Sequence, residues 1–508
     1  MSAAPVTPGG ADHQPRPDFL IVCSDEQRWD TVGAYGPVYG LPGNPVLRTP
    51  RIDRLAAAGT LFDAAFTPYP LCSPTRATMW TALYPHQHDV LGNKRPMRLP
   101  AGFVTPVEAM RDAGYLTGYV GKWHVPGASP RELGFADARA LGRDWGRDID
   151  EYRAHLRTRG YRISDRTVEN LTEEEVALLD LPDAPSAGTS ALPLEDHLEP
   201  WLTDRTIELV DDAASSDAPF FIVVGYNAPH FPMFVPAPYD RAYDPADVPL
   251  PPSFDDPLEG KPAIHGERFS WTRVHHLSPD GWRKVIAHYW GLVSLVDDQV
   301  GRLVDALERL GRAESTIIVY TSDHGDLMGA HHLIEKGPWN VYEETVRLPM
   351  VIGDPRRPAG RVVPELVSQV DLLPTLLDLA GVPVPPGTAG RSLVPLMDGA
   401  ADWRDALYGE TAGLSQKPGV DPPLAQQDLD PEHLLIVKWL RTQRWKYAFY
   451  STDRDELYDI VLDPSEMRNL ASEPAYAELI RAFRRRLVAW MDETGDPLLP
   501  RLLPRLTA

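Results

Sequence analysis

Three short, mainly apolar runs, each followed directly by polar residues, place the strongest constraint on how this chain can fold. The runs comprise residues 19–23, 220–224 and 316–320. Short apolar runs of this kind are typical of strands that a sheet buries on both faces. Helical patterns alternate with them at residues 51–58, 105–113 and 283–310. Strands that alternate with helices predict an α/β fold with a mostly parallel central sheet flanked by helices.

Acidic and imidazole side chains follow the ends of these runs. Asp25 and Glu26 follow the first run, Asp323 and His324 follow the third, and the second leads to His230. The carboxyl ends of parallel strands meet at one edge of a sheet, where α/β proteins bind ligands. Carboxylates brought together there repel one another unless a cation lies between them. The pattern predicts a metal site, although acids at strand ends also serve as helix caps or turn residues.

The remaining segments suggest three parts. Residues 1–17 are rich in Pro, Gly and Ala, which predicts a disordered tail. Residues 18–404 contain the strands and helices and should form the catalytic domain. Polar, irregular insertions near 125–200 and 236–282 are expected to cover the site rather than to join the sheet. Residues 405–508 predict a smaller α+β subdomain with short antiparallel strands and a closing helix.

Charge and hydropathy exclude several kinds of partner. With a net charge of −22 the chain has no excess of Lys and Arg that could neutralise phosphates, so we expect no nucleic acid partner. The chain has no apolar stretch of the roughly 18 residues that span a membrane, and its start lacks the pattern of a signal peptide. Two cysteines, Cys23 and Cys72, cannot build a disulfide framework. These features predict a cytoplasmic protein with no membrane partner.

The segment Cys-Ser-Pro-Thr-Arg at residues 72–76 is the most informative part of the chain. Taken alone, Cys72 fits a buried, unreactive thiol as well as a nucleophile. Further segments change this balance: Gly-Lys-Trp-His at 121–124, Ala-Pro-His at 228–230, Ser-Asp-His-Gly at 322–325, Glu-Lys-Gly at 335–337 and Glu-Leu-Tyr-Asp at 456–459. In this order the segments resemble the motifs of the sulfatase family, which belongs to the alkaline phosphatase-like superfamily.

The resemblance implies a catalytic group that is not a standard amino acid. In sulfatases the cysteine of the Cys-x-Pro-x-Arg motif is oxidised to formylglycine by a formylglycine-generating enzyme, which would act on Cys72 during maturation. The hydrate of this aldehyde is a diol held on one divalent metal ion. One hydroxyl attacks the ester, and the other later loses its proton and expels the sulfate. The implied metal ligands are Asp25, Glu26, the modified Cys72, Asp323 and His324.

The resemblance also implies roles for five basic residues. Lys122 would bind the sulfate group, and His124 would help to deprotonate the diol during release. His230 would face the leaving-group oxygen as a general acid, with Lys336 assisting it. Arg76 would order the diol and the metal ligands rather than contact the substrate. For each of them the competing interpretation is a solvated surface charge, the usual state of an isolated lysine.

Two positions depart from the common sulfatase pattern. Glu26 stands where many members have a second aspartate, and its longer side chain leaves its place among the ligands open. His324 stands where many members have asparagine. The Asp-His version resembles phosphonate monoester hydrolases and choline-sulfatase-like members. Nitrogen ligation moves metal preference from Ca²⁺ towards Mn²⁺, so either ion is expected here.

The motifs together predict an enzyme, a sulfuric ester hydrolase that acts on small sulfate monoesters. A phosphonate monoester or phosphodiester hydrolase with the same groups is the alternative. The pair Lys122 and His124 favours the sulfatase, because we expect this segment to differ in a phosphonate hydrolase. Two weaker hypotheses are an unmodified Cys72 thiolate as nucleophile and a non-catalytic metal-binding relative.

The insertions carry aromatic and imidazole side chains that could read the alcohol half of the substrate. Packing of the insertions onto the core is the commoner role of such side chains, and self-association into a homo-oligomer is a third use that the sequence leaves open. The residues concerned are Trp145, Tyr152, His197, Trp201, Trp271, His275 and His276.

Overall fold

The structure is a computed structural model that describes residues 16–142, 149–164, 171–179, 187–265, 277–337, 339–400, 402–414 and 434–507. Most of the tail predicted at residues 1–17 lies outside these ranges. The same holds for four side chains of the insertions, namely Trp145, Trp271, His275 and His276. No helix in the described part of the chain is both long and apolar enough to cross a membrane.

A nine-stranded sheet forms the centre of the molecule, in the order β11-β2-β10-β8-β1-β6-β3-β4, with the short β9 beside β2. The strands are β1 (Asp18–Asp25), β2 (Thr60–Phe66), β3 (Leu116–Lys122), β4 (Asp137–Gly142), β6 (Phe220–Pro229), β8 (Thr316–Ser322), β9 (Arg347–Leu348), β10 (Met350–Gly353) and β11 (Arg361–Ser368). Strand β1 is parallel to both of its neighbours, β6 and β8. The predicted α/β fold with a mostly parallel sheet is therefore confirmed, with β9 and β10 running antiparallel.

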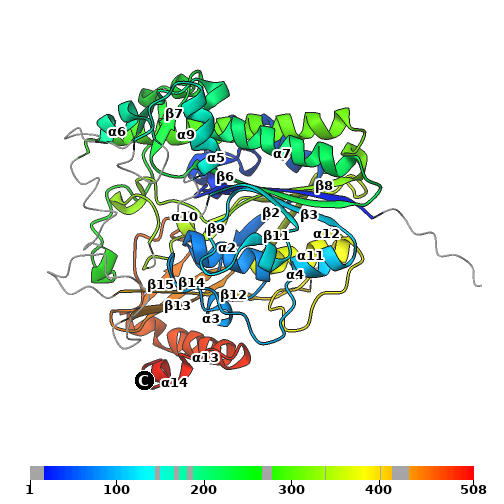
Figure 1. The fold of residues 1–508 in the computed structure, drawn as a ribbon. Helices are drawn as coiled ribbons and strands as arrows, with labels where there is room; N and C mark the ends of the chain where they lie inside the picture. The colour runs from blue at the N-terminus through cyan, green and yellow to red at the C-terminus, as the bar shows by residue number, and fades with distance from the viewer. Residues whose placement is uncertain are drawn as a thin grey trace, which may run out of the picture.

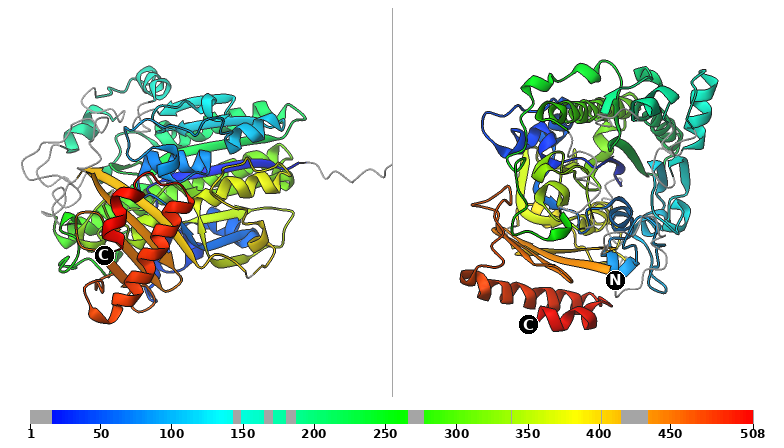
Figure 2. Two further views of the ribbon diagram at one scale, coloured as in Figure 1. Left: turned by 90° about the horizontal axis from the view of Figure 1, so that it is seen from below. Right: turned by 90° about the vertical axis from the view of Figure 1, so that its left-hand side faces the viewer.

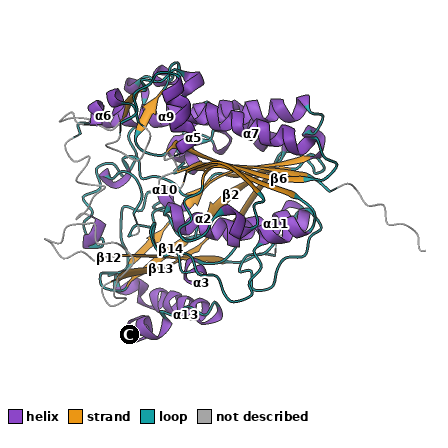
Figure 3. Cartoon of the chain, viewed as in Figure 1, coloured by secondary structure: helices purple, strands orange, loops and turns teal. Residues whose placement is uncertain are grey.

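Helices cover both faces of this sheet (Figures 1 and 3). Helices α1 (Pro50–Ala58), α7 (Leu198–Ala214) and α9 (Pro279–Arg309) pack on one face, and α2 (Cys72–Thr81), α4 (Pro106–Asp112) and α11 (Leu372–Leu379) on the other. Successive side chains of β1 alternate between the two cores: Leu20 and Val22 face α7 and α9, whereas Phe19 and Ile21 face α2 and α11. This burial on both faces explains why the strand is continuously apolar.

One expectation about the insertions is wrong. We predicted that residues 125–200 stay outside the sheet, but β4 joins it at the edge, parallel to β3. An edge strand is only half covered, so its sequence, Asp-Ala-Arg-Ala-Leu-Gly, lacks the apolar run that marks a central strand. The segment also contains α5 (Asp150–Thr158), α6 (Glu173–Leu179) and β5 (Ala187–Thr189), which pairs with β7 (Met233–Val235).

A second sheet, fully antiparallel, follows near the C-terminus, as predicted for this part of the fold. Its strands are β12 (Ala406–Leu414), β13 (Leu434–Thr442), β14 (Trp445–Tyr450) and β15 (Glu456–Asp459), and helices α13 (Ala477–Glu493) and α14 (Leu499–Leu506) lie against it (Figure 2). Strand β12 also contacts the segment that leads into α2. The amide of Glu410 donates to Pro68 O at 2.8 Å, and Tyr69 Oη donates to Ala412 O at 2.6 Å.

A buried cluster of charged side chains joins this second sheet to the short helix that follows α2. Lys438 lies within the protein and bonds the carboxylates of both Glu410 and Asp496. Nδ1 of His86, from α3 (Pro85–His88), lies 2.7 Å from Oε1 of Glu410. His86, Glu410 and Asp496 approach closely enough to hold a metal ion, but the Lys438 ammonium already supplies the positive charge that the two acids need.

The buried cluster predicts a large loss of stability when Lys438 is replaced by methionine. Two acids would lose their counter-charge inside the protein, and removal of one partner from a buried pair costs about 3–5 kcal/mol. The control is Arg444→Met, because Arg444 contacts Asp459 at 2.7 Å with 56% of its side chain exposed, and loss of such an exposed ion pair should change stability little. Urea unfolding of both variants measures the difference, and equal losses would contradict the prediction.

Candidate active site

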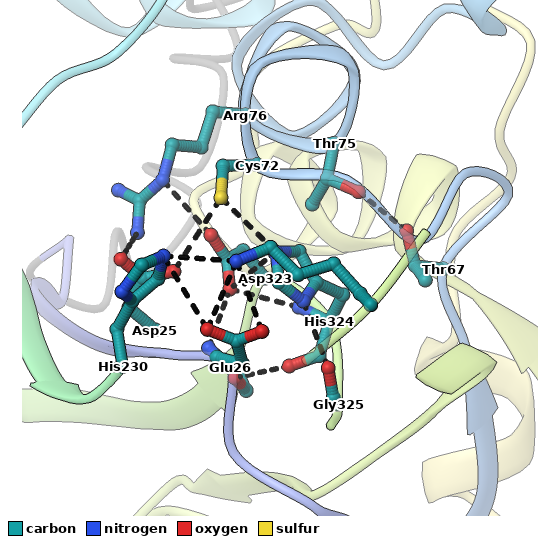
Figure 4. A network of polar contacts seen from close by, with 12 residues as sticks. Asp25, Glu26, Thr67, Cys72, Thr75, Arg76, His230, Asp323, His324 and Gly325 are labelled. Atoms are coloured by element: carbon teal, nitrogen blue, oxygen red, sulfur yellow. Dashed lines mark hydrogen bonds and ion pairs between the residues drawn. The ribbon is translucent and has the colours of Figure 1, made fainter. Parts of the chain in front are cut away.

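Three elements bring four metal-binding side chains together at the carboxyl edge of the sheet (Figure 4). Asp25 ends β1, Asp323 and His324 follow β8, and Cys72 is the first residue of α2. Oxygen, nitrogen and sulfur atoms of these four residues lie within 4.8 Å of one another, and all four side chains are buried. The sulfur of Cys72 is 3.2 Å from Nε2 of His324 and 3.8 Å from Oδ1 of Asp25.

The donor set of this group fits a divalent metal ion. Nδ1 of His324 lies 2.9 Å from the carbonyl oxygen of Gly325. A carbonyl can only accept, so Nδ1 carries the proton and Nε2 directs its lone pair at the group, the arrangement that a ligating imidazole needs. The carboxylates of Asp25 and Asp323 add hard oxygen ligands to the imidazole nitrogen of His324. Asp25, Cys72, Asp323 and His324 are thus the residues that would hold the ion.

Glu26, the fifth predicted ligand, lies apart from this group and faces two other predicted residues. Its carboxylate is 2.9 Å from Nζ of Lys336 and 3.3 Å from Nε2 of His230. Lys336 in turn lies 2.8 Å from Nε2 of His230, whose Nδ1 lies 2.5 Å from the Phe231 carbonyl. Since Nδ1 must donate to that carbonyl, Nε2 of His230 accepts from the ammonium. The three side chains form a buried triad. Figure 4 shows two of them, Glu26 and His230, beside the metal group, the name used here for Asp25, Cys72, Asp323 and His324.

Lys122 ends β3, the strand next to β6, and His124 follows it two residues later. The Lys122 ammonium bonds the carboxylate of Asp25 and is 3.8 Å from the sulfur of Cys72. Although burial would raise the pKa of the Asp25 carboxyl, Lys122 and His230 hold it well below its ordinary value. Burial, reinforced by Lys122 and Arg76, holds the pKa of the His124 imidazole well below its ordinary value. The His124 imidazole is thus neutral at ordinary pH.

Arg76 is fully buried and connects the parts of the site to one another. Its Nε donates to Oδ2 of Asp323 at 3.0 Å, and its Nη1 donates to the Lys122 carbonyl at 2.7 Å. The guanidinium also lies 3.9 Å from Oδ2 of Asp25. That Arg76 orders the site rather than contacts the substrate stays a prediction, and these contacts let it hold Asp323 and the Lys122 backbone in place.

Several residues that support the site could not be identified from the sequence. Tyr119 donates to the Lys122 carbonyl at 2.5 Å, and Gln369 donates to the carbonyls of Ser322 and Asp323 at 2.9 and 3.1 Å. The guanidinium of Arg28 donates to the Leu327 carbonyl at 3.0 Å. In each contact a side chain donates to a backbone carbonyl, and the two groups come close only in the folded chain.

Two further histidines contact residues outside the group of four. Nε2 of His88 is 3.1 Å from Oγ1 of Thr78, and Nδ1 of His331 is 2.6 Å from Oδ2 of Asp256. Asn93 supports the start of α2, because its Oδ1 accepts from the Ser73 amide at 3.2 Å.

Comparisons with known proteins agree with this geometry. The family model described as Sulfatase matches residues 17–382. The chain is 31% identical over 497 residues to an uncharacterised sulfatase, YidJ, of Escherichia coli K12, with 95% of this chain and 88% of that protein covered. It is 28% identical over 517 residues to the multifunctional alkaline phosphatase superfamily protein PehA of Trinickia caryophylli, with 95% and 97% covered.

Solved structures show the same relationship. The phosphonate monoester hydrolase of Agrobacterium radiobacter matches with a TM-score of 0.77 and 27% identity, over 94% of this chain and 96% of that one. Fold and site together define a hydrolase of the alkaline phosphatase-like superfamily. Within that superfamily, the chain belongs to the sulfatase family.

The contacts of Arg76 predict that a methyl group at Gly225 would damage the site without unfolding the protein. A Cβ there would lie 2.8 Å from Oη of Tyr119, 2.9 Å from the Lys122 carbonyl and 3.3 Å from Nη1 of Arg76. Displacement of these groups by a fraction of an ångström should lower kcat/KM about 10- to 100-fold in Gly225→Ala.

The control for this substitution is Gly281→Ala in α9, where the added Cβ meets only Leu277 and Ser278 at 3.5 Å or more. That variant should keep wild-type kinetics. Steady-state kinetics and circular dichroism of both variants make the comparison, and wild-type activity of a folded Gly225→Ala would show that the Arg76 contacts do not set the geometry of catalysis.

Proposed function

We propose that this enzyme hydrolyses sulfate monoesters with a formylglycine generated from Cys72 and one divalent metal ion. The observation that supports it most directly is the position of Cys72, at the start of α2 and within the group that fits a metal ion. A thiol at this place would make a poor nucleophile, because burial raises its pKa above the ordinary value and so favours the protonated form.

The buried charges around Cys72 support an anionic substrate. Lys122, Lys336 and Arg76 face Asp25, Glu26 and Asp323, so the side chains are close to neutral as a set. A divalent ion would leave the site positive, and it would polarise the ester and favour ionisation of the diol. A sulfate monoester carries one negative charge and complements such a site.

The roles of the basic residues follow from their positions. Lys122, whose Nζ is 3.8 Å from the Cys72 sulfur, would bind the oxygens of the ester. His124, a neutral imidazole, would take the proton that releases the sulfate. Lys336 and His230 share a hydrogen bond at 2.8 Å, and this pair would deliver a proton to the leaving oxygen. Arg76 would hold the acids and the Lys122 backbone in place.

A phosphonate monoester or phosphodiester is the second candidate substrate. Two observations favour it: the Asp323-His324 pair and the likeness to a solved phosphonate monoester hydrolase. Such esters also carry one negative charge on a tetrahedral centre. Lys122 and His124, both present and both beside the metal group, favour the sulfate ester.

The proposal predicts an aldehyde at residue 72 in protein made together with a formylglycine-generating enzyme. Mass spectrometry of the tryptic peptide that spans residues 55–76 should show CH₂SH replaced by CHO. Cleavage of 4-nitrophenyl sulfate should exceed cleavage of 4-nitrophenyl phenylphosphonate, and Cys72→Ala should lose at least about 100-fold with both. An unmodified thiol in active protein would refute the formylglycine mechanism, and the opposite substrate order would establish the phosphonate ester instead.

The nitrogen ligand predicts which metal ion supports activity. Enzyme freed of metal by a chelator should regain more activity with Mn²⁺ than with Ca²⁺, because His324 contributes an imidazole. The variant His324→Asn replaces nitrogen by an amide oxygen and should move the preference towards Ca²⁺. Metal content and activity after reconstitution measure both effects, and an unchanged preference would show that His324 does not select the ion.

A further inference from the structure

The segment that carries His230 is a short turn between two strands. Strand β6 ends at Pro229, and β7 begins at Met233. The turn must present His230 to Lys336 at 2.8 Å. A loop of this length keeps one geometry only if the chain on both sides of it is held.

Two buried side chains at the start of α7 hold both sides of this turn. Oε1 of Glu199 accepts from the Ala228 amide, just before the turn, at 2.9 Å. Nε2 of His197 lies 3.1 Å from the carbonyl oxygen of Phe234, just after the turn. Nδ1 of His197 and Oε2 of Glu199 are 2.8 Å apart. The two residues are 8% and 1% exposed, so water does not compete for these contacts.

The Phe234 carbonyl can only accept, so Nε2 of His197 donates the hydrogen bond between them. Glu199 lies in the first turn of α7, where the partial positive charge of the helix end favours a carboxylate.

We infer that His197 and Glu199 are positioning residues for His230. They clamp the backbone on both sides of its turn and thereby hold its imidazole against Lys336, where the proton for the leaving oxygen is held. This inference rests on the proposed function, because it assigns the pair to the step that His230 serves there. It also gives the end of the polar segment 125–200 a task in the reaction, since α7 begins at Leu198.

Helix α7 is well suited to act as the fixed support. It packs on β6, where Oγ1 of Thr203 and Oη of Tyr226 are 2.7 Å apart, and its apolar side chains belong to the core between sheet and helices. The rings of Tyr152 and Trp201 pack nearby at a tilt of 49°, with their centroids 5.2 Å apart. The start of the helix therefore cannot move without disturbing the core, and the pair transmits that rigidity to the turn.

The leaving group separates a positioning role from a merely structural one. An activated 4-nitrophenolate leaves without protonation, whereas an alkoxide needs a proton, and general acid catalysis contributes about 10²- to 10⁴-fold. The test compares 4-nitrophenyl and phenethyl esters of whichever oxyanion the substrate panel identifies. In Glu199→Ala, kcat for the phenethyl ester should fall about 10- to 100-fold, with only a small change for the nitrophenyl ester.

Two further variants make the test specific. Glu199→Gln can accept from Ala228 through its amide oxygen and donate to an unprotonated Nδ1 of His197, so it should restore the turn and the phenethyl rate. Glu208→Ala removes an acid of the same helix that is 51% exposed and pairs with Arg205, and it should behave as wild type. Circular dichroism verifies that each variant is folded.

His230→Ala distinguishes the two ways in which the inference can fail. If it slows both esters equally, the pair of Lys336 and His230 does not supply the proton of the leaving group, and that part of the proposed function fails together with the inference. If it slows only the phenethyl ester, but Glu199→Ala slows both equally or neither, the proposed function stands and the positioning role is wrong. Failure of Glu199→Gln to restore the phenethyl rate would also overturn the inference.

Discussion

The close approach of acids and bases at the carboxyl edge of the sheet is the interaction on which the rest of this structure depends. Asp25, Glu26 and Asp323 are fully buried together with Arg76 and Lys122. Burial of even one uncompensated charge costs several kcal/mol, so none of these side chains can be placed independently. Their arrangement requires a sheet that brings two strand ends together and a helix that delivers Arg76 from a third direction. The central strands meet the first need and α2 meets the second.

The position of α2 is in turn set by the C-terminal part of the chain. Strand β12 bonds the segment just before the helix through Pro68 and Tyr69, and the Lys438 cluster holds α3 just after it. The helix that begins with Cys72 is thus fixed at both ends by residues more than three hundred positions away. The second sheet, although it lies outside the site, therefore helps to hold Cys72 in place.

The sequence was sufficient for the parts of this arrangement that follow from periodicity and from motif order. Apolar runs ending in Asp25 and Asp323 predict strands whose ends meet, because parallel neighbours share one edge. Strand β4 escaped detection because an edge strand needs no apolar run. The direction of Glu26 also could not be predicted, since side-chain alternation stops where the strand ends. Contacts such as that of Arg76 with the Lys122 carbonyl leave no periodic signal, because they join positions 46 residues apart.

The same reasoning explains where substrate selectivity must arise. Each charged side chain at the centre of the site already contacts another part of it: Lys122 bonds Asp25, Lys336 bonds Glu26, and Arg76 bonds Asp323. In our proposal these groups recognise a tetrahedral anion, and they offer nothing that distinguishes one alcohol from another. Discrimination between alcohols therefore falls to the segments outside this centre. In our proposal the turn that carries His230 faces the leaving oxygen. Residues at the start of α7 contact this turn, so it connects the outer segments to the groups that act on the ester.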